Sequence, residues 1–329
     1  MTTRAKDAED DRAAEDTAVP ATTATGEVGS GTVDPVEAPG GVPAPLSRRR
    51  LVLRRFLRHK LGVIGLVVLV GLFVVAYLGP VISPWTYTDQ DVTSYLEPPS
   101  AEHWFGTTQI GEDVFVRTMR GLQKSLLIGL LVGLISTALA TVVGATAAYF
   151  GGLTDRALIW IVDLMLALPA LLVIGILSPA FDSWLILVPL LAAFSWLLAA
   201  RIVRGMTLSL REREFVQAAK FAGVPAWRII VRHIVPNMAS LLIIDATVTV
   251  GLAILAETGL SYLGFGVQPP DTSLGTLISD GTSSALTSPW LFMFAGGLLV
   301  LAVLAVNFVG DGLRDALDPS SQRGRKEKP

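Results

Sequence analysis

The sequence predicts an all-α, polytopic membrane protein with six transmembrane helices. Hydrophobic residues make up 51% of the chain and charged residues only 16%, whereas soluble domains have about 25% charged residues. A hydrocarbon core of ~30 Å requires about 20 helical residues, and six apolar runs near that length occur along the chain. Basic residues gather before the first run, after the fourth and after the sixth, which is typical of a chain that crosses a bilayer repeatedly.

The six predicted spans differ in their charge content. Asp163 lies in the third span and Asp245 in the fifth, whereas the other four are uncharged. The second span is long enough to tilt in the bilayer. The predicted spans are approximately 61–80, 125–150, 157–177, 183–200, 238–256 and 290–310.

Basic residues predict the orientation of these spans, because cytoplasmic loops carry an excess of lysine and arginine. Seven basic residues immediately precede the first span, seven follow the fourth and five follow the sixth, whereas the segments 79–124, 178–182 and 257–289 together contain three. Six spans also put both termini on one side. The sequence therefore predicts a multi-pass protein of the cell (inner or plasma) membrane with both termini in the cytoplasm.

The two ends of the chain are predicted to lie outside the membrane domain, which covers 47–319. Residues 1–46 contain nine acids, three bases and almost no large apolar side chains. Such a segment cannot bury enough apolar surface to offset the entropy of ordering, so it is predicted to be a disordered acidic cytoplasmic tail. The first apolar run begins too late for a secretory signal. Residues 320–329 form a basic tail.

The cytoplasmic segment 211–237, called the elbow below, predicts two short helices joined by a sharp bend. Small and apolar residues recur at three- and four-residue spacing from Phe215 to Ala222, as on one face of a helix. Gly223 and Pro225 interrupt this helix, and a second can start at Pro225. A bent pair with an apolar face suits a groove on a partner. The alternative is a basic amphipathic loop on anionic lipid, but lipid binding does not require the break.

The elbow resembles the cytoplasmic coupling loop of ABC-importer permease subunits. The family usually has glutamate at the position of Gln217 and leucine at that of Val235. The longer form of the pattern resembles the second permease of dipeptide, oligopeptide and nickel importers. The residues that carry the resemblance are Ala218-Ala219, Gly223 and Ile234-Val235-Pro236, extended by Trp227-Arg228 and Arg232-His233.

Other blocks extend this resemblance over 48–319. Two positions depart from the family pattern, with Thr108 where an acid is usual and Glu112 where arginine is usual. The further blocks are His103–Thr107, Gly111–Phe115, Thr258–Pro270 and Asn307–Pro319.

The resemblance implies a type I ABC importer permease fold and a hetero-oligomer. Its implied partners are a second permease, two ATP-binding subunits, an extracytoplasmic substrate-binding protein and the lipid bilayer, and no nucleic acid. The implied binding-protein-facing residues are Trp104, Phe105, Tyr262 and Phe265. The implied ATPase-coupling residues are Glu214, Gln217, Ala218, Ala219, Gly223, Trp227, Arg228 and Pro236.

The residues indicate a conduit rather than an enzyme. The chain contains no phosphate-binding loop of the Gly-x-x-x-x-Gly-Lys-Ser/Thr type and no cysteine, and its three histidines lie outside the spans. Intramembrane metalloprotease and Ser–His protease sites are therefore not expected. We expect no catalytic residue, no metal and no cofactor in this chain, and ATP hydrolysis by partner subunits.

The two acids within spans should each face a cavity or a partner, because a carboxylate at mid-bilayer costs about 2.5–3.5 kcal/mol. For Asp163 we expect a polar contact that pins its helix, with Arg156 as the candidate partner. For Asp245, lining of the translocation pathway and an interhelical hydrogen bond both stay open. Proton coupling would require a relay partner, and none is evident.

The segments predicted to lie outside have two expected features. Apolar residues in 110–124 are spaced along one helical face, which predicts a short interfacial helix before the second span. The segment 258–270 contains three glycines and two prolines, which predicts an irregular loop folded against the bundle.

The predicted function is that of a permease subunit of an ATP-driven, peptide-type ABC importer, which forms half of the pathway and couples to the ATPase through the elbow. The alternative is an ATP-independent secondary transporter or channel, which would require internal repeats or matching broken helices, and no sequence repeat is visible. The cargo stays open among oligopeptides, dipeptides, nickel chelates and other small solutes.

Overall fold

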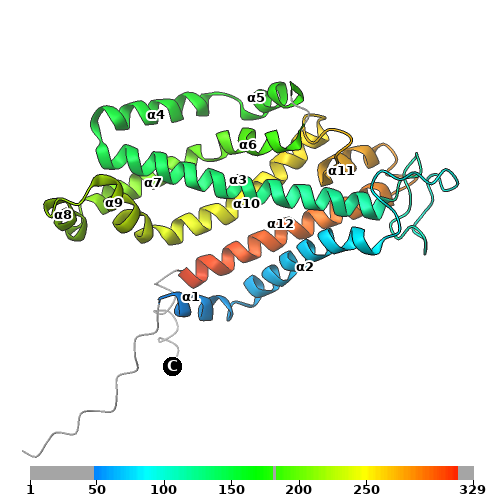
Figure 1. Ribbon diagram of the computed structural model, residues 1–329, viewed down its shortest axis with the longest axis horizontal. Coiled ribbons are helices and arrows are strands. Elements are labelled where there is room, and N and C mark those ends of the chain that lie inside the picture. Colours follow the sequence, from blue (N-terminus) through cyan, green and yellow to red (C-terminus); the bar gives the residue numbers. More distant parts are fainter. Residues whose placement is uncertain (1–47, 181–182, 318–329) are drawn as a thin grey trace, which may run out of the picture. The chain divides into compact units, whose positions relative to one another are not determined.

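The computed structural model describes residues 48–180 and 183–317, and these residues form helices joined by short segments and one longer loop (Figure 1). In this part of the chain no β-strand occurs, and two isolated bridges, Gln90 with Glu112 and Thr107 with Asp113, tie the loop before α3 together. The predictions for the tails 1–46 and 320–329 lie outside the described residues.

Within the described residues, four helices are long and apolar enough to cross a bilayer, and two bent pairs bring the number to six if each pair is one span. The four are α2 (Lys60–Ile82), α3 (Val114–Phe150), α10 (Ala239–Tyr262) and α12 (Trp290–Leu317). The first pair is α4 (Gly152–Ala167) with α5 (Ala170–Leu177), bent by 79°, and the second is α6 (Leu187–Ser195) with α7 (Leu197–Arg211), bent by 45°.

Short elements connect these spans. The helix α1 precedes α2, and α8 and α9 form the elbow, whereas α11 lies at the opposite end of the bundle (Figure 1). Their bounds are α1 Arg48–Phe56, α8 Glu214–Phe221, α9 Ala226–Ile229, a π-helical turn Ile230–Ile234, α11 Leu274–Thr282, and 3-10 turns Ser178–Ala180, Trp184–Ile186 and Val235–Asn237.

The helix α3 is the centre of the packing. It contacts α7 and α10, while α2 lies along α12 and α10 also contacts α12 (Figure 1). The close approach of α3 and α7 requires a small residue at Gly144, because a Cβ there would lie 2.4 Å from the Ala200 carbonyl oxygen and 2.9 Å from Val203 Cβ. The bundle is thus held by direct backbone proximity as well as by apolar side chains.

The expected separate interfacial helix before the second span is wrong. The 37 residues of α3 form one helix, since no proline interrupts the run and Asp113 caps its start by accepting from Val116 N–H at 2.9 Å. Apolar residues at the start of this helix are buried among the aromatic side chains of the preceding loop, as Met119 is. The face recognised in 110–124 therefore packs against protein.

The boundaries of the third and fifth spans also differ from expectation. The third breaks at Leu168 and Pro169, because proline cannot continue the helical hydrogen-bond ladder, and α5 leaves at a steep angle. The fifth does not end near 256, and the expected irregular loop starts only at Leu263, since α10 runs to Tyr262. Gly259 costs only about 1 kcal/mol within a helix, and burial of Leu260 and Ser261 favours continuation.

Candidate functional site

The elbow contains the sharp bend that its glycine and proline predict. Gly223 has φ +75°, and its N–H bonds to the Lys220 carbonyl at 3.0 Å, while Val224 N–H bonds to the Ala219 carbonyl at 3.1 Å. These two bonds form a Schellman motif that closes the end of α8. Pro225 then starts α9. The second predicted helix, which can start at Pro225, is instead a short α9 followed by a π-helical and a 3-10 turn.

One side of the elbow packs on the bundle and the other is open. The exposed side includes Phe221 and Trp227, which are 86% and 62% exposed, and the Arg228 guanidinium lies 5.3 Å from the Trp227 ring centre. The underside is an apolar cluster that joins the elbow to α3 and α7. Its buried members are Ala145, Val203, Val216, Ile229, Ile234 and Met238.

Polar contacts fix where the elbow leaves α7. The Gln217 side-chain amide donates to the Arg211 carbonyl at 3.0 Å, a bond that a glutamate carboxylate could not donate. Arg211 in turn donates to the Ala148 carbonyl at the end of α3, at 2.8 Å. The departure from the family pattern at Gln217 therefore has a definite role as a link between α8 and α7.

The remaining predicted coupling residues lie on the same element. Glu214 is exposed in the first turn of α8, where negative charge interacts favourably with the helix dipole. Ala218 is exposed and Ala219 half-buried, while Pro236 is exposed in the turn before α10. All eight residues thus share one compact protrusion of the bundle, although their contact with an ATPase stays a prediction.

Asp163 has a different partner from the one expected. Its carboxylate pairs with Arg201 of α7, and both side chains are about half exposed, so the expectation of Arg156 is wrong. Nearer the elbow, Asp155 of α4 makes a bidentate ion pair with Arg204, at 2.5 and 2.6 Å. Both pairs tie α4 to α7, which agrees with the expectation that Asp163 pins its helix.

Asp245 joins two central helices. The Thr137 hydroxyl of α3 donates to the Asp245 carboxylate of α10 at 2.8 Å, and the side chain is only partly buried. The interhelical hydrogen bond is therefore present. Because the Asp245 side chain is also partly exposed, its role in lining the pathway stays a prediction.

We expect Asp245→Asn to leave assembly intact, because the amide oxygen can still accept from Thr137. If Asp245 lines the pathway, removal of its charge should lower the initial rate of ATP-driven uptake several-fold at unchanged complex yield. Uptake in vesicles containing equal amounts of complex measures this effect. An unchanged rate would rule out the lining role.

Glu257 is a buried carboxylate that the sequence interpretation missed. It is fully buried in α10 and accepts from the Ser125 hydroxyl of α3 at 2.9 Å and from the Ser261 hydroxyl at 2.6 Å. Ser273, the N-cap of α11, donates to Ser261 at 3.1 Å. The spacing of Ser261 four residues after Glu257 was an available signal, but the acid was taken as the boundary of the span.

The motif around His103 builds a buried polar cluster before α3. His103 Nδ1 lies 2.8 Å from the Asp113 carboxylate and Nε2 lies 3.5 Å from Asp91, while Trp85 stacks on the imidazole. Hydrogen bonds from the Thr93 side chain and backbone, with smaller contributions from Ser94 and His103, lower the pKa of the Asp91 carboxyl to about 2. This cluster holds the loop against the cap of α3.

The four predicted binding-protein-facing residues lie at the end opposite the elbow, at different depths. Trp104 and Tyr262 are 45% and 46% exposed. Phe105 is half-buried because it stacks on Phe294 at 3.8 Å between ring centres. Phe265 is partly exposed and borders Gly175 of α5. Their contact with a binding protein stays a prediction.

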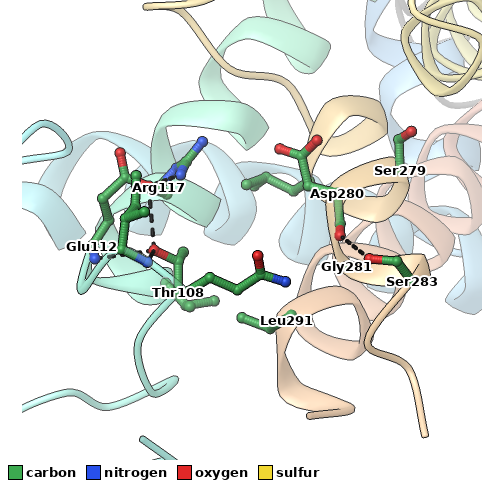
Figure 2. Close-up of a pocket in the computed structure, with 12 residues that line it drawn as sticks. Thr108, Glu112, Arg117, Ser279, Asp280, Gly281, Ser283 and Leu291 are labelled. Atoms are coloured by element: carbon green, nitrogen blue, oxygen red, sulfur yellow. Dashed lines mark hydrogen bonds and ion pairs between the residues drawn. The ribbon is translucent and has the colours of Figure 1, made fainter. Parts of the chain in front are cut away.

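A cavity of about 450 Å³ opens at this end between the loop before α3 and the helix α11 (Figure 2). Arg117 of α3 pairs with Glu112 on one wall, and Asp280 of α11 lies across from them. The Thr108 hydroxyl lies 3.3 Å from Glu112, so the two positions that depart from the family pattern contact one another. A second cavity of about 420 Å³ shares four of these wall residues, Glu112, Arg117, Ser279 and Asp280.

Comparison with known proteins gives consistent matches. Residues 140–323 match the family of binding-protein-dependent transport system inner membrane components, and residues 47–99 match the N-terminal TM domain of oligopeptide transport permease C. The chain is 54% identical over 283 residues to the oligopeptide transport system permease protein OppC of Mycobacterium tuberculosis, covering 85% of this chain and 97% of that protein.

More distant relatives carry similar names. The Haemophilus influenzae oligopeptide transport system permease protein OppC is 40% identical over 272 residues, covering 82% of this chain and 88% of the relative. A putative peptide permease protein of Brucella suis is 39% identical over 285 residues, covering 85% and 94%. The similarity therefore extends over the whole membrane domain.

Proposed function

The chain belongs to the family of binding-protein-dependent transport system inner membrane components, and from this membership we propose how the protein is driven and what it carries. It is a multi-pass membrane permease subunit of an ABC importer. We propose that its cargo is a short peptide, as the names of its relatives indicate for those proteins.

The proposed partners are a second permease, two ATP-binding subunits and an extracytoplasmic binding protein. The single observation that supports coupling to an ATPase is the elbow, whose exposed side presents Phe221 and Trp227 while its underside packs on α3 and α7. A bent, partly apolar helix pair suits a groove on another protein. Movement of that groove would be transmitted to α7 and α10, which the elbow connects in sequence.

The proposed orientation puts the elbow and both termini in the cytoplasm. Basic residues gather in the elbow and beside the termini, whereas the segments at the opposite end contain few, as the positive-inside rule describes. Transport would then be a shift between inward-open and outward-open states, biased by nucleotide on one face and by loaded binding protein on the other.

Reconstitution tests this proposal. We expect vesicles that contain the two permeases, the ATPases and the loaded binding protein to accumulate labelled tri-alanine only when ATP is present on the ATPase side. Vesicles with this chain alone should take up none. Unaided uptake by the single chain would overturn the proposal, and uptake of a nickel chelate in place of tri-alanine would overturn the peptide assignment alone.

A further inference from the structure

The cavity between the loop before α3 and α11 is lined by two acidic side chains and one basic side chain. On one wall, Glu112 and Arg117 form an ion pair and neutralise one another. Within the described residues, Asp280 makes no ion pair within 4.0 Å, although it lines the same cavity. The protein around Asp280 partly removes it from water and raises the pKa of its carboxyl, an effect that the charge of Arg117 opposes. The cavity therefore presents one acidic group without a matched cation.

The rest of the lining suits a small polar ligand with an apolar part. The volume of about 450 Å³ falls within the ~300–1,000 Å³ of ordinary small-molecule pockets. Ser279, Ser283 and Gln109 supply hydroxyl and amide groups, and aliphatic side chains complete the walls. A primary ammonium donates three hydrogen bonds and has no acceptor, so a cavity lined by a carboxylate and by hydroxyl and amide oxygens matches it. The aliphatic lining residues are Ile110, Val114, Leu277 and Leu291.

We propose that this cavity binds the ammonium end of a peptide, with Asp280 as its counter-ion. This inference rests on the proposed function, in which the cargo is a peptide. The ammonium would lie beside the Asp280 carboxylate, and the Glu112–Arg117 pair would form the opposite wall (Figure 2).

The adjoining cavity favours a peptide over a single lysine side chain of a docked protein. It shares Glu112, Arg117, Ser279 and Asp280 with the first and extends along the segment 264–272. Each residue of an extended chain spans about 3.3–3.6 Å. The second cavity, which adjoins the first at these shared residues, thus provides room for further residues of an extended peptide. A single inserted side chain would leave that room empty.

Equilibrium dialysis of the purified full-length chain in detergent tests the site. The probes are labelled tri-alanine, which carries an ammonium group, and N-acetyl-tri-alanine, which lacks it. We expect tri-alanine to bind, and we expect acetylation of the probe or Asp280→Asn to weaken binding at least tenfold. The control is Glu102→Gln, because Glu102 is an exposed acid of the loop before α3 that lines neither cavity, and it should leave binding unchanged.

The alternative outcomes are distinct. Equal binding of the free and acetylated probes, or equal binding by Asp280→Asn and the parent chain, overturns the proposal. If Asp280→Asn weakens capture of the binding protein and not of tri-alanine, the cavity receives a basic side chain of that protein and the proposal is again wrong. ATP-driven uptake of tri-alanine by the unmodified complex is measured separately. Normal uptake without binding at Asp280 rejects this site alone, whereas absent uptake rejects the proposed function.

Discussion

Replacing Gly223 with aspartate is expected to leave the chain in the membrane and to abolish recovery of the ATPase with it. The φ of +75° at Gly223 costs other L-residues roughly 1–2 kcal/mol. Among the residues that the structure describes, no atom lies within 4 Å of a Cβ added at Gly223, so the first atom of the new side chain causes no clash with the bundle. The new carboxylate would instead lie at the exposed bend beside Phe221, and docking would remove it from water at a cost of several kcal/mol.

Co-purification through a tag on the permease measures this effect. The matched control is Gly223→Asn, because asparagine has nearly the same shape, tolerates the left-handed conformation and carries no charge. We expect the asparagine variant to retain most of the bound ATPase and the aspartate variant to retain almost none, with equal amounts of both in the membrane fraction. Full recovery of the ATPase with Gly223→Asp would contradict docking through the elbow.

The elbow could be predicted because its structure depends on local chemistry. Glycine adopts a positive φ without strain and proline at the start of a helix lacks only an N–H that would be unpaired there, so Gly223 and Pro225 define the bend wherever the segment packs. The apolar runs were equally visible, since their length matches the bilayer. The bend is encoded within a few consecutive residues, and each span is encoded in the average hydropathy of about 20 consecutive residues.

Features that depend on tertiary packing were not predictable in the same way. The partner of Asp163 is Arg201, 38 residues away, and no sequence spacing indicates that α4 and α7 lie together. The cavity at Asp280 combines the loop before α3 with α11 and α12. The helix α11 itself was taken as part of an outer segment, because nine residues give too short a pattern to separate a helix from a loop.

Glu257 illustrates a different error, in which a generally correct rule ended the predicted span well before the end of α10 at Tyr262. Acids are rare within spans, so the predicted fifth span ended at Ala256. In the structure the carboxylate is accommodated because Ser125 and Ser261 donate to its two oxygens. The cost of burial is thus offset by one hydrogen bond from Ser261 of the same helix and one from Ser125 of α3, and the sequence of α10 alone does not reveal the second of these.

Replacing Glu257 with leucine is therefore expected to destabilise the end of the bundle opposite the elbow. The substitution leaves the buried hydroxyls of Ser125 and Ser261 without their acceptor, at about 1–3 kcal/mol for each group. The same hydroxyls accept from the backbone N–H groups of Leu274 and Val267, at 3.3 and 3.2 Å. Loss of their fixed orientation should therefore loosen the start of α11 and the segment before it.

Two measurements check this expectation. The midpoint of thermal unfolding in detergent should fall. Exchange of backbone amide hydrogens should accelerate over 263–282 relative to the parent chain, and it should accelerate less in the elbow. Glu257→Gln is the matched control, because its amide oxygen still accepts from one serine while the other hydroxyl can rotate to accept from the amide N–H₂. We expect glutamine to lose less stability than leucine. Equal exchange over 263–282 in the leucine variant and the parent chain would mean that Glu257 does not hold α11 to α3 and α10.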